Sequence, residues 1–412
     1  MAHEVVIVGG GLSGLCCALE LYRNGVSFLL IEATDRVGGR VKTDQCDGFL
    51  LDRGFQVLLT AYPEAQRVLD YSALRLKPFY PGALVYDGSR FHRVADPWRK
   101  TRDSIKSILS PVGSLADKLR IAWLRRQVLD LSLENLMAGE ESTTEQRLEK
   151  LGFSPKIIDS FFQPFLGGVF LDADLTTSSR MLDFVFRMFS IGETAIPEKG
   201  MEAIPRQLLS MLPGDSIITD AKVKEIKTDS TELIVTLASG EKIETQTAVL
   251  ATNGLDNLLS EKKKPKSRVV SCFYFVSELP PITEPILVLN GTKSGLVNNL
   301  CVPSNISPTP TGAALISATV LGDSKHTTEV EPQVVKSELR QWFGTQVENW
   351  KHLKTYHISH ALPSAEQIPP QQLSYKYQEG IYLCGDYMES PSIQGAMVSG
   401  RKAAQAILGS RL

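Results

Sequence analysis

The chain opens with two apolar runs, separated by a glycine-rich turn and a helical repeat. Val5 to Val8 form a continuous apolar run, which is typical of a buried parallel strand. From Leu12 to Asn24 the apolar residues recur at helical spacing, and Gly25 provides a stop for that helix. Phe28 to Ile31 form the second apolar run. The pattern therefore predicts a strand, a helix and a second strand, in that order.

Apolar patterning further along the chain predicts a second region. Residues 97–190 have mostly helical spacing, whereas residues 269–277, 285–290 and 313–321 are short apolar runs that predict strands of one sheet. Residues 261–266, with the sequence EKKKPK, predict a charged linker that contains proline. These elements predict an α/β fold with an added α+β region of mixed sheet plus helices.

Length and composition limit the class of protein. A chain of 412 residues is too long for one ordinary core, so we expect two domains or one domain with a large insertion. A net charge of -2 argues against nucleic acid as a partner. The six cysteines form no CxxC pair, so we expect neither a metal site nor a disulfide framework.

The same features predict where the protein is found. The first motif begins almost at Met1, which leaves no room for a signal peptide in this chain. No apolar run reaches the ~18 residues that a membrane-spanning helix needs. We therefore expect a protein on the cytoplasmic or stromal side that is not secreted, with any membrane contact peripheral.

The turn after the first strand carries a nucleotide-binding motif. Gly9, Gly11 and Gly14 form GxGxxG between the predicted strand and helix. The first glycine allows a tight turn, the second lets the backbone approach a pyrophosphate, and the third lets the helix pack on the strand. The helix N-terminus, at Leu12 and Ser13, offers free N–H groups to the phosphates. Glycine-rich turns also occur in proteins that bind nothing, but this context favours a dinucleotide.

An acidic residue follows the second strand and begins the stretch EATDRVGGR. A carboxylate at this place accepts both hydroxyls of the adenosine ribose, in NAD as in FAD. Two arginines then supply donors suited to phosphate, and a glycine pair lets the backbone pass close to the cofactor. The alternative is a solvated basic turn. The residues expected at the cofactor are Glu32, Ala33, Arg36, Gly38, Gly39 and Arg40.

This stretch resembles the extended FAD motif of the flavin amine oxidase and phytoene desaturase superfamily, which also includes protoporphyrinogen oxidases. The segment LDRGFQVLLTAYPEAQ, residues 51–66, resembles the one that follows the FAD motif in plant-type carotene desaturases. KGMEAIPRQL at 199–208 and the β unit at 221–253 are similar to later parts of the family. IYLCGDYMESPSIQGAMVSGRKAAQAI, residues 381–407, resembles its closing FAD motif.

The resemblance implies non-covalent FAD as the cofactor. An acid at the end of the strand in the closing motif would bind a ribityl hydroxyl, and the helix that follows would stabilise negative charge on the reduced flavin. The valine of the β unit usually meets adenine in this family. The further cofactor residues implied are Gly54, Phe55, Gln56, Val57, Val223, Ala251, Gly385, Asp386, Ile393, Gly395 and Ala396.

These matches imply an interrupted domain layout. A Rossmann-like FAD-binding domain is expected to comprise residues 1–80, 200–265 and 372–412. A substrate-binding domain of mixed sheet plus helices is expected to comprise residues 81–199 and 266–371.

The activity implied is that of an FAD-dependent oxidoreductase, nearest to the plant-type carotene desaturases. We expect it to oxidise or desaturate a small apolar substrate, such as an isoprenoid or carotenoid, by hydride transfer to flavin N5, with oxygen or a quinone as electron acceptor. Ser392 stands where monoamine oxidases carry an aromatic residue, which argues against an amine. Amine or porphyrinogen oxidation, or a flavin-bound protein without turnover, remain alternatives.

No catalytic side chain can be assigned from the sequence. On a predicted strand over 356–363, Tyr356, Ile358 and His360 share one face and His357 lies on the other. Tyr356 or His360 would then face the substrate as an acid or base, but a packed or solvent-facing role is the simpler interpretation.

A basic and apolar segment suggests peripheral membrane contact. Residues 93–130 contain nine Lys or Arg and four Asp, within a chain whose net charge is -2. Apolar residues, among them Leu119 and Trp123, alternate with that charge, which suits an anionic lipid surface. An amphipathic helix pair packed on the substrate domain explains the same pattern.

Overall fold

The computed structural model describes residues 3–100, 110–229, 232–252, 258, 266–307, 309, 312–322, 330–368 and 373–410. Of the predicted linker, residues 261–265 lie outside the described residues, and so do residues 101–109 of the basic segment.

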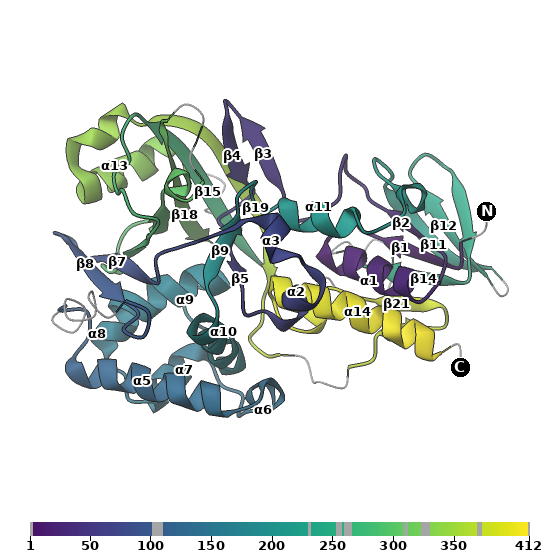
Figure 1. The fold of residues 1–412 in the computed structure, drawn as a ribbon, viewed down its shortest axis with the longest axis horizontal. Helices are drawn as coiled ribbons and strands as arrows, with labels where there is room; N and C mark the ends of the chain where they lie inside the picture. Colours follow the sequence, from purple (N-terminus) through teal and green to yellow (C-terminus); the bar gives the residue numbers. More distant parts are fainter. Residues whose placement is uncertain are drawn as a thin grey trace.

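One lobe of the molecule is built on a six-stranded sheet with the strand order β10, β2, β1, β14, β21 and β20 (Figure 1). β1 (Val5–Val8) lies between β2 (Phe28–Ile31) and β14 (Thr247–Leu250), and all three strands run parallel. β21 (Ile381–Leu383) pairs in parallel with β14. All four strands are apolar and buried apart from Thr247, as expected when a parallel sheet is covered on both faces. The outer strands are β10 (Ile217–Ile218) and β20 (Lys376–Gln378).

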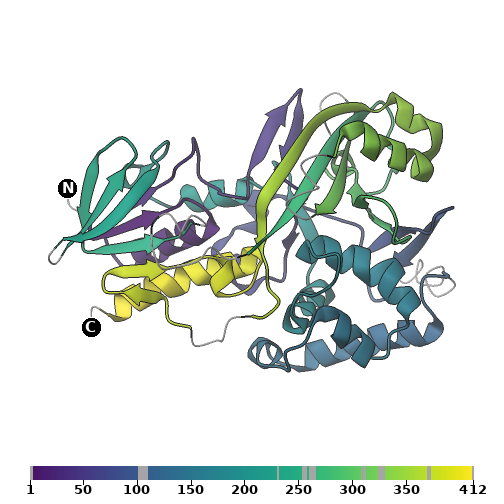
Figure 2. The ribbon, with the colours of Figure 1, turned by 180° about the vertical axis from the view of Figure 1, so that it is seen from behind.

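Two helices from opposite ends of the chain pack together beside this sheet (Figures 1 and 2). α1 (Leu12–Arg23) follows β1, and α14 (Ile393–Gly409) comes after β21. Their backbones approach closely, because a Cβ added at Gly400 would lie only 2.0 Å from the carbonyl oxygen of Ser13. The first turn of α1 therefore packs against the middle of α14.

Short elements surround this lobe and connect it to the rest of the molecule. A three-stranded antiparallel sheet covers one end, a hairpin projects from the middle, and a small sheet joins distant segments. The three-stranded sheet consists of β11 (Val223–Asp229), β12 (Glu232–Leu237) and β13 (Lys242–Thr245). The hairpin consists of β3 (Thr43–Cys46) and β4 (Phe49–Asp52). The small sheet consists of β5 (Leu58–Leu59), β9 (Thr194–Pro197) and β6 (Leu76–Pro78). The helices α2 (Pro63–Val68), α3 (Tyr71–Leu74) and α11 (Ala203–Leu209) lie between them.

The other lobe contains a seven-stranded sheet with the order β19, β15, β18, β17, β16, β7 and β8. One face of this sheet packs against α13 (Pro332–Phe343), with Phe273 and Phe275 in the same buried cluster as Trp342. The opposite face packs against α9 (Gln163–Phe170) of the same lobe. Its strands are β19 (Lys351–Pro363), β15 (Ser267–Ser277), β18 (Ala314–Gly322), β17 (Val297–Cys301), β16 (Leu287–Asn290), β7 (Gly82–Tyr86) and β8 (Phe91–Ala95).

Helices form the remainder of the second lobe. Two of them begin with a capping box, in which Ser114 and Asp117, or Thr143 and Gln146, satisfy each other's backbone donors. A π-helical turn at Ile158–Phe162 leads directly into α9, and such turns are frequent at functional sites. The helices are α5 (Leu115–Asp130), α6 (Leu133–Met137), α7 (Thr144–Lys150), α8 (Pro155–Ile157), α9 (Gln163–Phe170) and α10 (Ser179–Ile191).

The predicted fold class is confirmed. The first two strands have the predicted bounds, and the three later apolar runs form β15, β16 and β18 of one sheet. The limits of the two domains stay a prediction. Among the described residues, no helix is both long and apolar enough to cross a membrane.

Candidate FAD site

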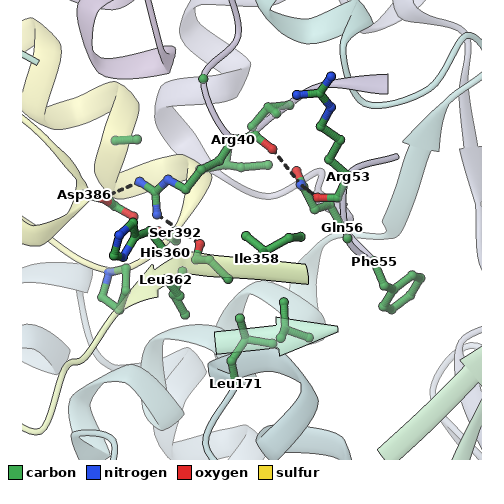
Figure 3. A pocket seen from close by; sticks show the side chains of 18 of the residues that line it. Arg40, Arg53, Phe55, Gln56, Leu171, Ile358, His360, Leu362, Asp386 and Ser392 are labelled. Carbon is green, nitrogen blue, oxygen red and sulfur yellow. Dashed lines mark hydrogen bonds and ion pairs between the residues drawn. The ribbon is translucent and has the colours of Figure 1, made fainter. Parts of the chain in front are cut away.

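A cavity of about 820 Å³ lies between the two lobes. It begins at the carboxyl ends of β1, β14 and β21, where Gly9, Ala251 and Cys384 line it. In α/β sheets, ligands bind in the crevice at the carboxyl ends of the strands. From there the cavity continues along β19 to α9 in the second lobe (Figure 3).

The glycine turn is shaped by close backbone contacts. Gly9 has a φ of +111°, and a Cβ there would lie 2.6 Å from the carbonyl oxygen of Ala251. A Cβ at Gly14 would lie 2.0 Å from the carbonyl oxygen of Gly9, so Gly14 allows α1 to pack on the turn. α1 begins after Gly11, which supplies no side-chain cap, and its first turn contains no acidic residue. The N–H groups of that turn are therefore suited to phosphate.

Glu32 is held firmly at the end of β2. Its Oε2 accepts a hydrogen bond of 2.7 Å from the Gly10 amide, and its Oε1 accepts from the amide and hydroxyl of Thr34. The side chain is buried and lines the cavity. A carboxylate oxygen can accept more than one hydrogen bond, so Glu32 keeps acceptor capacity for ribose hydroxyls.

Arg40 links the FAD motif near the start of the chain to the closing motif at residues 381–407. Its Nη2 lies 2.7 Å from Oδ1 of the buried Asp386, and its Nη1 donates to the carbonyl of Ala361 at 3.1 Å (Figure 3). Burial tends to lower the pKa of Arg40, but the Asp386 carboxylate outweighs that effect and raises it. The structure thus brings together two residues that the sequence places at opposite ends of the chain.

Arg36, four residues earlier, lies away from the cavity lining. Its guanidinium contacts Asp44 at 2.7 Å and Glu202 at 3.1 Å. Asp44 also accepts from Arg53 and from the hydroxyl of Tyr356. Burial tends to raise the pKa of Asp44, but these hydrogen bonds hold it well below its usual range. Arg36 therefore belongs to an ion-pair cluster at one edge of the site, and its phosphate contact stays a prediction.

The segment after β4 forms one side of the cavity, as Gly54, Phe55, Gln56 and Val57 all line it. Gly54 has a φ of +91°, and a Cβ there would lie 2.8 Å from Cδ1 of Ile358 on β19. Gln56 closes the loop, because its Nε2 donates to the carbonyl oxygens of Arg40 and Arg53 (Figure 3).

The closing motif brings the start of α14 to the cavity. Ser392 caps the helix by accepting from the Gly395 amide at 3.0 Å, and it lines the cavity together with Ile393 and Ala396. A Cβ at Gly395 would lie 1.9 Å from the carbonyl oxygen of Ser390. The glycine is thus required by the turn before the helix.

Most of the predicted cofactor residues line this single cavity: Gly9, Gly11, Leu12, Ser13, Glu32, Gly38, Gly39, Arg40, Gly54, Phe55, Gln56, Val57, Ala251, Gly385, Asp386, Ile393 and Ala396. Gly14 and Gly395 lie behind the lining and shape it. Ala33, Arg36 and Val223 are not part of the lining, so their cofactor contacts stay predictions.

The far half of the cavity was not identified from the sequence. It is lined by apolar residues of the second lobe, chiefly from α9, α10 and β16. Leu171 lies there with a φ of +53°, which is unusual for a residue other than glycine and marks a strained turn (Figure 3). The sequence feature that could have indicated this half of the cavity is the glycine pair inside the aromatic run FFQPFLGGVF, residues 161–170. The residues concerned include Phe165, Val169, Leu171, Val185, Phe189 and Leu287.

The strand β19 crosses the cavity with the predicted alternation. Ile358 and His360 point into the cavity (Figure 3). His357 points to the other face, where its Nδ1 lies 2.8 Å from Oγ of Ser271 and its ring meets Phe273 edge to face. Tyr356 donates to Asp44, and burial together with that carboxylate raises the pKa of Tyr356, which keeps its hydroxyl protonated.

The only cysteine among the described lining residues of this cavity is Cys384. It is fully buried, and burial raises the pKa of its thiol to about 12, so it is unreactive near neutral pH. Over the described ranges, no three His, Cys, Asp or Glu side chains lie close enough together to hold a metal ion.

These features fit FAD. The tight glycine turn and the uncapped start of α1 suit a pyrophosphate, and the buried Glu32 suits the ribose. At the other end of the cofactor half, the start of α14 lies beside the ion pair of Arg40 and Asp386. Gly38 and Gly39, with φ of +120° and +58°, leave room for backbone to pass close by.

Comparison with known proteins supports this assignment. The profile of the family described as "Flavin containing amine oxidoreductase" matches residues 12–408. Protoporphyrinogen oxidase 2 of Arabidopsis thaliana is 30% identical over 173 residues, which cover 40% of this chain and 32% of that protein. A 4,4'-diaponeurosporene oxygenase of Staphylococcus aureus is 29% identical over 79 residues, 19% of this chain and 16% of that protein. The matched parts thus span at most about a third of these relatives.

Solved structures show the same fold. Putrescine oxidase bound to putrescine matches with a TM-score of 0.75 at 18% identity, over 99% of each chain. Cyclohexylamine oxidase from Brevibacterium oxydans IH-35A matches with a TM-score of 0.68 at 15% identity, over the whole of each chain. The match over residues 12–408 shows that the chain belongs to the flavin-containing amine oxidoreductase family. The fold and the cofactor cradle, which is the part of the cavity lined by the glycine turn, Glu32, Arg40 and Asp386, agree with this. The protein is therefore an FAD-dependent oxidoreductase.

Proposed function

We propose that the protein oxidises or desaturates an apolar substrate of the isoprenoid or carotenoid kind. The observation that carries this proposal is the apolar wall of the far half of the cavity, with Phe165, Val169 and Leu287 facing the space that continues from the cofactor cradle. Two relatives are named for 4,4'-diaponeurosporene and for protoporphyrinogen, which agrees with an extended substrate.

FAD in this cavity would supply the hydride acceptor, at flavin N5. The chain's own residues position the reactants: the glycine turn and Arg40 hold the cofactor, while the apolar wall excludes water and orients the substrate. Tyr356 is committed to Asp44 as a donor and keeps its proton, so it is not a base. We assign no side chain to proton transfer.

Reduction of the bound flavin without oxygen tests the proposal. The holoprotein is mixed with phytoene, protoporphyrinogen IX or putrescine, and the visible flavin absorbance is followed. We expect bleaching by phytoene, and slower bleaching in Val169→Asp at unchanged flavin content.

Bleaching by putrescine or the porphyrinogen alone would establish the alternative substrate class. Bleaching by dithionite but by no substrate would indicate a flavoprotein without turnover. Re-oxidation of the reduced protein by oxygen or by a quinone then identifies the acceptor.

We also infer that the flavin is bound non-covalently, because the buried thiol of Cys384 is poorly suited to form a link. Acid precipitation should release the flavin into the supernatant. Flavin that stays with the pellet would contradict this inference.

Peripheral membrane contact is a separate proposal, supported by one face of α5. Leu115, Leu119 and Trp123 are 64%, 73% and 51% exposed and recur every four residues, so they form one outward apolar stripe. Arg120 and Arg125 have partners within the protein, Asp117 and the carbonyl of Ser190. Charge reversal at those two arginines would therefore disturb the fold as well as any lipid contact.

The membrane proposal is tested by co-sedimentation with anionic liposomes at low and high salt. We expect Leu119→Asp to reduce binding. The matched control is Leu279→Asp, because Leu279 is 74% exposed and lies outside α5. Equal binding of the two variants would contradict a role for the stripe.

A further inference from the structure

A second cavity of about 1080 Å³ adjoins the far half of the first one. It lies between the last two strands of the seven-stranded sheet, β7 and the edge strand β8, and the helices α5 and α10. Six residues line both cavities and form their common wall: Phe55, Val57, Phe165, Val169, Phe189 and Leu287.

The second cavity is aromatic on one side and basic on the other. The aromatic lining comes from the π-helical turn, from α10 and from the chain after β6, and includes Phe79, Phe161 and Phe186. The basic lining consists of Arg99, Lys100, Lys118 and Arg125, and the acidic lining consists of Asp96 and Glu193.

Arg125 on α5 is the centre of the basic side. Its Nη2 donates to the carbonyl of Ser190 at 2.9 Å, and its guanidinium lies 4.7 Å from the centre of the Trp98 ring. Its Nε is buried and has no hydrogen-bond partner among the described residues. Since a carbonyl and a ring are neutral, neither of these described contacts compensates the positive charge of Arg125, although its buried Nε is not itself open to the cavity.

Among the lining residues that the structure describes, the basic side chains outnumber the acidic ones. Arg99 lies 3.5 Å from Asp96 and also donates to the carbonyl of Phe189, so this acid is matched by its own cation. Lys100 lies 5.6 Å above the Tyr80 ring. Glu193 is exposed at the rim. Within the described part of the lining, the number of basic side chains near Arg125 therefore exceeds the number of acidic ones.

We propose that the second cavity binds the anionic head of an amphiphilic substrate, a carboxylate or phosphate, at Arg125 and Lys100. The apolar chain of that substrate runs past the common wall toward the flavin. This proposal rests on the proposed function and extends its substrate class from neutral isoprenoids such as phytoene to molecules with an apolar body and one anionic end. Capping of α10 explains the contact of Arg125 with Ser190, but it leaves the charge of the guanidinium and the adjoining aromatic space unexplained.

Binding of three matched compounds to the holoprotein tests the proposal. Geranylgeranoate, geranylgeranyl diphosphate and geranylgeraniol share one apolar chain and differ in the head group. Calorimetry below their aggregation limit should give an affinity at least about tenfold higher for one anionic compound than for the alcohol, since a hydrogen bond between charged groups is involved. The better of the two anions identifies the head group. Equal affinities for all three would overturn the proposal.

Variants of α5 localise the head group. Arg125→Gln should remove most of the preference for the anion, whereas Arg126→Gln should keep it, because Arg126 is the next residue but 82% of its side chain is exposed. Leu119→Asp should also keep it, which distinguishes the cavity from a lipid surface. If Arg125→Gln fails to fold, Lys100→Gln decides, since Lys100 is exposed and its described contact is the Tyr80 ring. A preference that survives in the deciding variant would overturn the proposal.

The outcome is distinguishable from a failure of the proposed function. Anion-selective binding without flavin reduction by any isoprenoid would leave the cavity assignment in place and remove the function. Flavin reduction by a neutral carotene without anion-selective binding would keep the proposed function and remove the assignment of the second cavity.

Discussion

The two halves of the main cavity are built in different ways. In the cofactor half, the backbone determines the shape: Gly9, Gly14 and Gly395 stand where a single added carbon would meet another backbone at 2.6 Å or less. In the substrate half, side chains determine the shape, and Gly168 on α9 would bring a Cβ only to 3.0 Å from the side chain of Asn298. Backbone contacts permit almost no substitution, whereas side chains can move.

The strongest test of this contrast is Gly395→Ala. The added methyl group would overlap the backbone of Ser390, so we expect loss of bound FAD and destabilisation of about 3 kcal/mol or more. The matched control is Gly409→Ala at the end of the same helix, where nothing lies within 4 Å, and it should leave both properties unchanged. Flavin content and urea unfolding are the measurements. Retention of FAD at wild-type stability by Gly395→Ala would break the contrast.

Glu32→Ala should have the next largest effect. It removes the acceptor for ribose hydroxyls and also leaves the Gly10 amide without its partner, so FAD affinity should fall at least about tenfold. Asp35→Ala is the control, because Asp35 is nearby but 65% exposed. Dialysis followed by flavin titration compares the two variants, and equal affinities would show that Glu32 does not contact the cofactor.

Asp52, the last residue of β4, should respond to pH. Its carboxylate accepts from the Met201 amide, and its carbonyl accepts from the hydroxyl of Tyr274. Burial raises the pKa of Asp52 to about 6, although hydrogen bonds from Thr43 and Met201 oppose this. The folded state therefore holds the proton more tightly than the unfolded state, and this contribution to stability is lost as pH rises from about 4 to 6.

Asp52→Asn removes that titration and keeps a side-chain oxygen that can accept from both the Thr43 hydroxyl and the Met201 amide. Relative to wild type, its free energy of unfolding should rise between pH 4 and pH 7, by up to about 3 kcal/mol. Denaturant unfolding across this range measures the difference. A difference that does not change with pH would assign the ionisation to another group.

Gly168→Ala should have the smallest effect. The helix gains about 1 kcal/mol from alanine, while the amides of Asn298 and Asn299 shift by a few tenths of an ångström, so stability should change by less than about 1 kcal/mol. FAD content should be unchanged, and only the rate with an apolar substrate should respond. Loss of FAD would show that the substrate half constrains the cradle more tightly than its contacts indicate.

The same contrast explains what could be predicted from the sequence. Gly9, Gly11 and Glu32 were identifiable, because their roles depend on local backbone geometry within one strand, turn and helix. Arg36 and Arg40 looked equivalent, yet one binds Asp44 and Glu202 and the other binds Asp386. Their partners come from distant segments, so spacing alone could not distinguish them.

The substrate half could not be predicted for a related reason. Phe165, Val169 and Leu287 are ordinary apolar residues, and they form a wall only because a helix and a strand far apart in the chain meet there. The second cavity depends equally on tertiary packing: Arg125 was counted as part of a basic segment, but its contacts with Trp98 and Ser190 appear only in the fold.

The packing of α14 against α1 has a consequence for biosynthesis. β1 and α1 leave the ribosome well before their later partners, because β1 pairs with β14, β14 pairs with β21, and α14 follows later still. Until residues 381–409 have been translated, the nascent chain exposes the edge of an incomplete parallel sheet, which is prone to wrong pairing. Flavin uptake is therefore expected to be a late event of maturation, and chaperones that shield the unfinished sheet should increase the yield of yellow protein.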